Sequence, residues 1–230
     1  TLARNDILFQ SAQINCDSSI LNVPLVQILG DSSTSFRNFI EDVRLEILLD
    51  KSFVSSSDLK YFVPFSKNIN ETLWLSGRVS GTISELRGRN IKISYGNLTS
   101  LDCDFDISGL PKLENSFIYL GINSLITNAS DIEKINIPGK SPIKFPELFY
   151  KLGNVFFDGS FTGFTTDFVA YGSLRTSQGT ISTDISCRPE ESDRFKVNGL
   201  VKGSSIALGQ LTGKPEIFGN LSMRANVDGY

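Results

Sequence analysis

The chain of 230 residues contains no histidine and only three cysteines. Without histidine, neither a Ser-His-Asp nor a Cys-His nucleophile can be assembled, and every metal site that needs an imidazole ligand is excluded. Three cysteines cannot all pair within one chain, and a disulfide framework needs an even and denser set. We therefore interpret Cys103 and Cys187 as buried free thiols that act as small apolar side chains.

Long apolar runs and an excess of positive charge are also missing. The longest apolar runs fall far short of the roughly 18 residues that a membrane-spanning helix needs. A net charge of −3 and a pI near 5.1 leave no basic stripe to neutralise phosphates, which argues against a nucleic-acid partner. No signal-peptide pattern follows Thr1, and the strand-like pattern still continues at Tyr230, so we expect a piece of a longer protein.

Motifs that would carry catalysis or metal binding are incomplete. Two Ser-x-x-Lys sequences, at 57–60 and 141–144, lack the companion motifs of acylating enzymes. The acidic stretch 102–106 resembles a calcium loop, but Ile107 and Leu113 stand where glycine and a bidentate glutamate are needed. On a strand, these three carboxylates would share one solvated face and repel one another. We expect no enzyme, no metal site and no cofactor.

The sequence is rich in short strand-like stretches separated by polar turns. Residues 101–107 alternate most clearly, with Asp102, Asp104 and Asp106 between apolar residues. In residues 168–174 apolar side chains occur at both the even-numbered and the odd-numbered positions, so the sequence does not show which face points inward. Short helices are expected at 57–64, 130–135 and 204–211, between groups of four strands. Short turns favour sequential hairpins, which predicts an all-β antiparallel meander.

Part of this pattern occurs twice, about 80 residues apart. A repeat made of strands indicates stacked β units that bury their apolar faces jointly. We divide the chain into the end of an upstream β unit (1–53), a first full unit (54–152), a second unit (153–212) and the start of a third (213–230). The matching segments are Leu75–Gly81 with Phe157–Gly163, Tyr95–Leu98 with Tyr171–Leu174, and Asp106–Ser108 with Asp184–Ser186.

The expected strands have one apolar and one polar face, and few helices are available to cover the apolar one. Either two sheets enclose a core, or one curved sheet leaves an open apolar groove that implies a ligand. The pattern alone favours the closed core. A glycan-binding β-sandwich or a spacer also stays open, although only Trp74 is an aromatic at an outward position. The candidate groove-lining residues are Leu75, Val79, Ile83, Ile91, Ile93, Phe105, Ile107, Phe157, Phe161, Ile181, Ile185, Phe195 and Val197.

Several short signatures occur in order along the last two thirds of the chain. They are Ser76–Thr82, Gly159–Phe164 followed by Asp167–Ala170, and Leu208–Leu211 before Gly219–Met223. From about Leu73 onward the chain resembles the TamB/AsmA-like family of cell-envelope proteins, in the form found in Bacteroidota-type bacteria. Residues 1–50 share only the general pattern.

The resemblance implies a long periplasmic protein tethered to the inner membrane by a helix outside this chain. It implies repeated antiparallel β-meander units that form an elongated curved sheet folded into a groove (β-taco-like), with short helices between units. Such proteins are associated with phospholipid transport between the inner and outer membranes and with outer-membrane protein assembly. The implied partners are phospholipid acyl chains and a BamA/TamA-like outer-membrane barrel, and no catalytic residues are implied. With the resemblance, the open groove becomes the favoured alternative.

Overall fold

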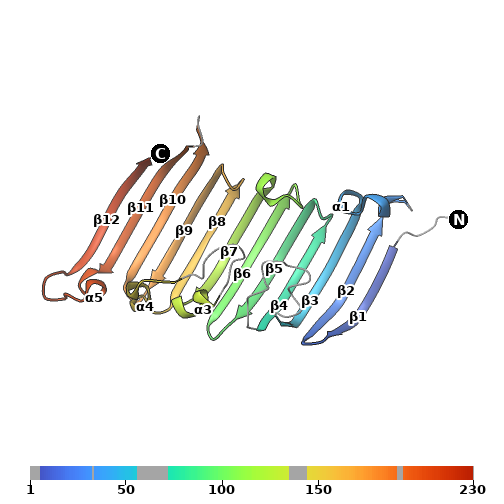
Figure 1. Ribbon diagram of the computed structural model, residues 1–230, viewed down its shortest axis with the longest axis horizontal. Coiled ribbons are helices and arrows are strands. Elements are labelled where there is room, and N and C mark those ends of the chain that lie inside the picture. Colours follow the sequence, from blue (N-terminus) through green and yellow to red (C-terminus); the bar gives the residue numbers. More distant parts are fainter. Residues whose placement is uncertain (1–5, 33, 56–71, 135–143, 191–193, 230) are drawn as a thin grey trace.

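The structure is a computed structural model that describes residues 6–32, 34–55, 72–134, 144–190 and 194–229. The described strands form a single antiparallel sheet of twelve strands whose spatial order follows the sequence order (Figure 1). The expected all-β antiparallel meander is confirmed. The strands are β1 (Asp6–Cys16), β2 (Ser19–Gly30), β3 (Val43–Ser55), β4 (Thr72–Gly81), β5 (Glu85–Tyr95), β6 (Thr99–Ser108), β7 (Phe117–Thr127), β8 (Val155–Gly163), β9 (Phe168–Thr176), β10 (Gly179–Pro189), β11 (Phe195–Ala207) and β12 (Asn220–Gly229).

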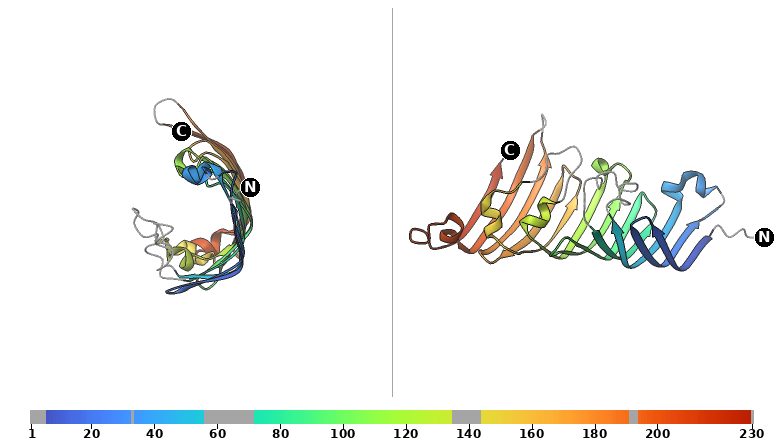
Figure 2. Two further views of the ribbon diagram at one scale, coloured as in Figure 1. Left: turned by 90° about the vertical axis from the view of Figure 1, so that its right-hand side faces the viewer. Right: turned by 60° about the horizontal axis from the view of Figure 1, so that its bottom comes forward.

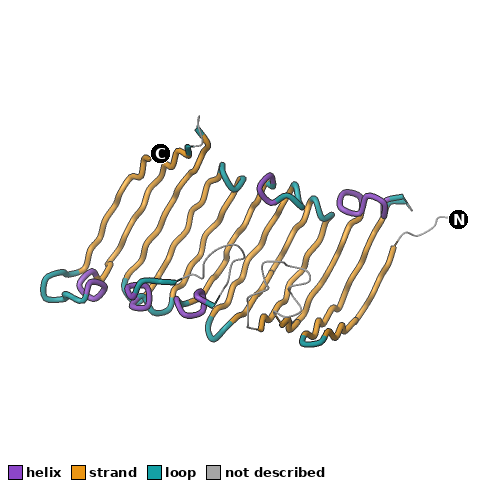
Figure 3. The backbone as a smooth tube through the Cα atoms, in the orientation of Figure 1, coloured by secondary structure: helices purple, strands orange, loops and turns teal. Residues whose placement is uncertain are grey.

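Short helices lie at the ends of the strands (Figure 3). The helix expected at 130–135 is confirmed, whereas the one expected at 204–211 begins later. Its first residues still belong to β11, because a bulge between Gly203 and Ile206 lets β11 continue its pairing with β12. The helix expected at 57–64 lies outside the described residues. The helices are η1 (Ser35–Asn38), α1 (Phe39–Asp42), η3 (Leu113–Asn115), α3 (Ala129–Glu133), α4 (Glu147–Lys151) and α5 (Leu208–Thr212).

The sheet bends into a C when it is viewed along its long axis (Figure 2, left). β-Bulges in several strands account for part of this bend, because an extra residue kinks the strand that carries it. Lys51 in β3, Asn90 in β5 and Ser205 in β11 have positive φ angles of 42°, 51° and 50°, and the strand pairing shifts beside each of them. In β5 the bulge also shifts the alternation of side chains. Arg89 and Lys92 are three residues apart and would lie on opposite faces of a regular strand, but they share one face here.

Most apolar side chains of the alternating strands lie on the face on which the helices lie. Thr99 is in register with Tyr95 on that face, and its hydroxyl donates to Asp131 of α3. A Cβ atom placed on Gly30 of the same face would lie 3.0 Å from the Phe36 ring of η1. Figure 2 shows these helices inside the C. The apolar face is therefore the concave face, and the polar face is the convex face.

The concave face is not closed into a core. None of the described leucine, isoleucine or phenylalanine side chains is buried, and the buried apolar residues are Val23, Val43, Val54, Tyr95, Cys103 and Ala129. The accessible surface is 14531 Å², whereas a compact monomer of this mass exposes about 10,300 Å². Within the described residues no second sheet faces the apolar side. One open curved sheet, not a sandwich, is the architecture.

Charged side chains on the convex face pair across neighbouring strands. Arg89 of β5 donates to both carboxylate oxygens of Asp106 on β6, at 2.7 and 2.9 Å. Asp102 lies 3.8 Å from Lys92, and Asp104 accepts a hydrogen bond from the backbone of Asn90 at 2.7 Å. The three carboxylates therefore do share one face, as expected, but each has its own partner. The expectation that they repel one another overlooked the basic strand beside them.

The cysteines are all free, and they differ in burial. Cys103 is buried as expected, and that burial, followed by the charges of Asp104 and Asp102, raises its pKa. The prediction that Cys187 is also buried is wrong, because its side chain is half-buried, and Cys16 is exposed. Among the described helices, none has the length and apolar character needed to span a bilayer.

Candidate functional site: the concave face

Strand register places almost all of the candidate groove residues together. Twelve of the thirteen lie on strands β4–β6, β8, β10 and β11 and share the concave face. The exception is Ile83, which lies in the turn after β4 ends at Gly81. None of the thirteen is buried, and Ile181 and Phe195 are each 41% exposed.

A row of directly paired residues crosses the middle of the concave face on all twelve strands. It contains no polar side chain, and at about 4.8 Å per strand it is about 50 Å long. Neighbouring members face each other across the sheet, so their side chains form a continuous apolar stripe. The central row is Phe9, Val26, Ile47, Val79, Gly88, Phe105, Leu120, Phe161, Ala170, Ile185, Gly199 and Val227.

A second row runs parallel to the first, two residues along each strand. It is equally free of polar side chains and also crosses all twelve strands. The second row is Ile7, Ile28, Leu45, Gly81, Leu86, Ile107, Ile118, Gly163, Phe168, Cys187, Val197 and Gly229. Together the two rows form an apolar band that no element of the described chain covers along its whole length.

Sequence reasoning missed the contributions of β1–β3, β7, β9 and β12 to this band. In β9 the ambiguity is resolved by pairing with β8, which places Phe168, Ala170 and Leu174 on the concave face and Val169 and Tyr171 on the convex face. In β1 and β2 the alternation was loose, whereas β3 alternates clearly from Val43 to Leu49 but was not included among the groove residues. A search for cross-strand apolar partners, given the correct hairpins, would have found these residues.

Two glycines of the concave face lie beneath phenylalanine rings. A Cβ atom on Gly172 would lie 2.6 Å from the ring of Phe157, and one on Gly88 would collide with the Phe105 ring. These rings therefore rest close against the backbone. A glycine on the concave face can leave open the space that a side chain would otherwise occupy. At these two positions the room is filled by the protein's own aromatic rings.

Replacing Gly172 by alanine should destabilise the fold by about 1–3 kcal/mol, because the new methyl group collides with the Phe157 ring. Gly219 has no neighbouring atom within 4 Å, so Gly219→Ala serves as the matched control and should change stability by about 0.5 kcal/mol or less. Urea denaturation measures both. The double variant with Phe157→Leu should lose less stability through Gly172→Ala than the single variant does. If it loses as much, contact with the Phe157 ring is not the cause of the destabilisation.

Asp131 of α3 anchors one rim of the concave face. Its carboxylate is 1% exposed and accepts hydrogen bonds from the backbone N–H groups of Leu98 at 2.9 Å, Thr99 at 3.0 Å and Asn97 at 3.3 Å. Burial by itself would raise the pKa of Asp131, but these bonds and the Thr99 hydroxyl lower it below its usual value. The carboxylate thus holds the α3 rim to the β5–β6 turn.

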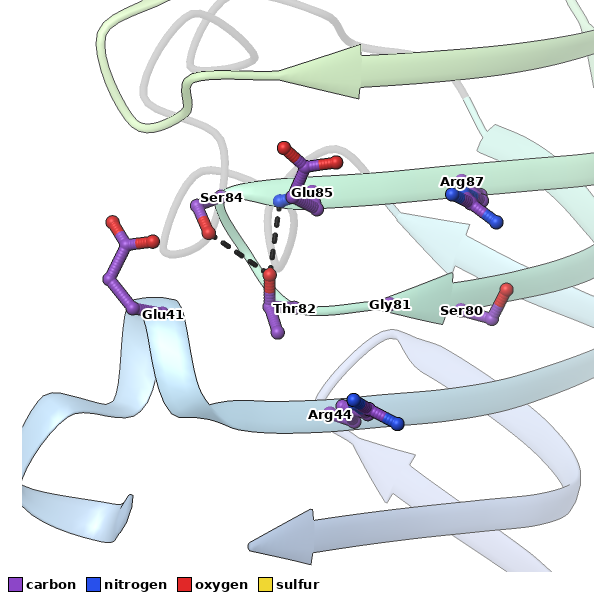
Figure 4. Close-up of a pocket in the computed structure, with 8 residues that line it drawn as sticks. All are labelled: Glu41, Arg44, Ser80, Gly81, Thr82, Ser84, Glu85 and Arg87. Carbon is purple, nitrogen blue, oxygen red and sulfur yellow. Dashed lines mark hydrogen bonds between the residues drawn. The ribbon is translucent and has the colours of Figure 1, made fainter. Parts of the chain in front are cut away.

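A polar cavity of about 450 Å³ lies at the ends of β3–β5 beside α1 (Figure 4). Two arginines and two glutamates, Arg44, Arg87, Glu41 and Glu85, line it, so its formal charges balance. The Thr82 hydroxyl lies 3.0 Å from that of Ser84 and accepts from the Glu85 backbone at 3.1 Å. These bonds stabilise the turn and present no nucleophile with an adjacent base.

The convex face also carries exposed aromatic side chains. Trp74 is 53% exposed, as its outward position predicted, and it contacts Phe53 edge to face with ring centroids 5.2 Å apart. The view that no other aromatic lies outward is wrong. Phe117, Tyr119 and Tyr171 are 43%, 40% and 58% exposed on the same face.

Comparison of this chain with protein-family models, curated proteins and solved structures finds no match. The features that bear on function are therefore those of the chain's own residues, above all the two apolar rows of the concave face.

Proposed function

We propose that this chain is part of a periplasmic hydrophobic-groove protein that moves phospholipids between the inner and outer membranes. The acyl chains would lie along the concave face while the head groups stay in water. The observation that carries this proposal is the pair of apolar rows that cross all twelve strands without burying a single described leucine, isoleucine or phenylalanine. Exposed apolar surface on this scale is typical of a binding surface.

The energetics favour an acyl chain as the occupant. Removing one methylene from water is worth about 0.8 kcal/mol, so a dozen methylenes fully covered would gain roughly 10 kcal/mol. A chain covered on one side only keeps roughly half of that gain. A continuous band offers this gain at every position along the sheet, so a lipid can move along it without crossing a polar barrier.

The wider setting of this proposal comes from the family resemblance. Membership of that family would place the protein in the periplasm, with an inner-membrane anchor outside this chain and a BamA/TamA-like outer-membrane barrel as partner. It would also assign no catalytic role. Outer-membrane protein assembly is the alternative role within the same resemblance.

Photocrosslinking in cells tests the proposal directly. A photoreactive residue placed at Phe105 or Phe161 points to the concave face. The same photoreactive residue at Asp104, which precedes Phe105, or at Thr162, which follows Phe161, points to the convex face. We expect radiolabelled phospholipid adducts at the first pair only. Equal labelling of both pairs, or none at either with abundant folded protein, contradicts the proposal. Protein adducts in place of lipid at Phe105 or Phe161 would favour the assembly role.

A further inference from the structure

A polar furrow lies on the convex face, opposite the proposed lipid surface. Its floor is made of Ser173 on β9 and Ser182 on β10, which pair directly across the two strands. Asp158 on β8 and Lys202 on β11 continue the same row at its two ends. Because serines are smaller than the residues of the adjacent row, this row is recessed and leaves a cavity of about 300 Å³.

The adjacent row forms one wall of the furrow. Tyr171, Asp184 and Leu200 are paired in sequence across β9, β10 and β11. On the far side of this wall lies a second cavity of about 330 Å³, which shares Asp184 and Leu200 with the first. It adds the side chains of Ser186, Asn198 and Asn226. The two cavities form a single hydrogen-bonding surface that extends across β8–β12.

The chemistry of this surface combines a flat aromatic ring with many neutral hydrogen-bonding groups. Tyr171 is 58% exposed, more than any other described aromatic side chain. The side chains of Asp184 and Lys202 make no hydrogen bond or ion pair with any described residue, so an acceptor and a donor are available beside the ring. Sugars match this set, because their C–H faces pack on aromatic rings and their hydroxyls both donate and accept.

The charges argue for an uncharged ligand. Asp158 already has a partner in Arg175 at 3.4 Å, and the charges of Asp184 and Lys202 cancel. A phosphate-bearing ligand would find no excess of positive charge there, and an apolar ligand would leave the serine floor without hydrogen bonds. We propose that the convex furrow over β8–β12 binds a neutral glycan chain, with Tyr171 as the stacking platform and Asp184 as the central acceptor.

Titration of the purified chain with cellohexaose and chitohexaose tests the furrow, with binding followed by calorimetry. Tyr171→Ala should weaken binding at least about tenfold, because it removes the stacking ring. Asp184→Asn should weaken it by about threefold to tenfold, because a charged acceptor is lost. Tyr119→Ala is the matched control, since Tyr119 is 40% exposed on the same face and lies outside both cavities. Its binding should match that of the unmodified protein.

Three results would overturn the glycan site. They are no binding of either oligosaccharide at millimolar concentration, equal losses for Tyr171→Ala and Tyr119→Ala, and capture of a protein ligand at the furrow without any glycan affinity. Thermal midpoints of the variants show that each remains folded. The furrow uses the face opposite the apolar rows, so this outcome is independent of the lipid experiment.

Discussion

Replacing Asp131 by asparagine should lower the free energy of unfolding by about 3 kcal/mol at neutral pH. The buried carboxylate satisfies three backbone N–H groups of the β5–β6 turn and the Thr99 hydroxyl. An amide has one acceptor oxygen in place of two, and its NH₂ group would face donors. Urea denaturation of the purified chain measures the loss.

Asp102→Asn is the matched control for this change. Asp102 lies on the convex face with 36% of its side chain exposed, and its ion pair with Lys92 is long, at 3.8 Å. Such pairs contribute about 1 kcal/mol or less. Equal losses for the two variants would mean that Asp131 does not hold the turn to α3.

The pH dependence of stability provides a second measurement on Asp131. The folded state lowers the pKa of this carboxyl, so its stabilising contribution is complete above the ordinary aspartate value of about 3.9. It is lost as the pH falls through the lower, folded-state pKa. The unmodified protein should therefore lose more stability than Asp131→Asn on acidification below about pH 4. Parallel stability curves for the two proteins would contradict this assignment.

Placing a carboxylate in the central row should disrupt lipid binding. Phe161→Glu puts a charge among apolar neighbours on the concave face, between Leu120 and Ala170. An acyl chain lying there would have to desolvate the carboxylate, at a cost of about 2 kcal/mol or more, which corresponds to roughly thirtyfold weaker binding. Lipid carried through purification, quantified by mass spectrometry, or binding of a fluorescent phospholipid measures the effect.

Two controls separate the charge from a general loss of folding. Thr162→Glu adds the same carboxylate one residue away on the convex face and should leave lipid binding within about twofold. Phe161→Leu keeps the position apolar and should retain most of the binding, although it removes the contact with the Phe168 ring at 4.9 Å. If Phe161→Glu binds lipid as well as Thr162→Glu does, the concave face is not the lipid surface.

Much of the fold could be predicted because alternation is a local property. The stretch Leu101–Ile107 shows both of its faces directly, and short turns limit its neighbours to the strands before and after it. The repeat was only partly reliable. Leu75 and Phe157 occupy matching concave positions, as do Ile107 and Ile185, but Tyr95 is buried on the concave face and Tyr171 is exposed on the convex face.

The candidate site was predictable only where strands alternate without interruption. Bulges such as the one at Asn90 change the parity of a strand, and their positions depend on pairing with the neighbouring strand. The furrow beside Tyr171 was not predicted, because a recessed row of serines exists only once Ser173 and Ser182 are paired. Asp131 was missed for the same reason, since its partners lie more than thirty residues away.

By itself, the sequence determined that this chain forms antiparallel strands with one apolar and one polar face. That information is carried by the alternation of apolar and polar residues, by the turn residues, and by the scarcity of charged residues at every second position of a strand. Only the tertiary structure decided that the apolar faces do not meet. Whether the sheet closes on itself or stays open depends on the curvature and register of all twelve strands together. A few bulges bend this one continuous sheet, and no local pattern of residues specifies the combined result.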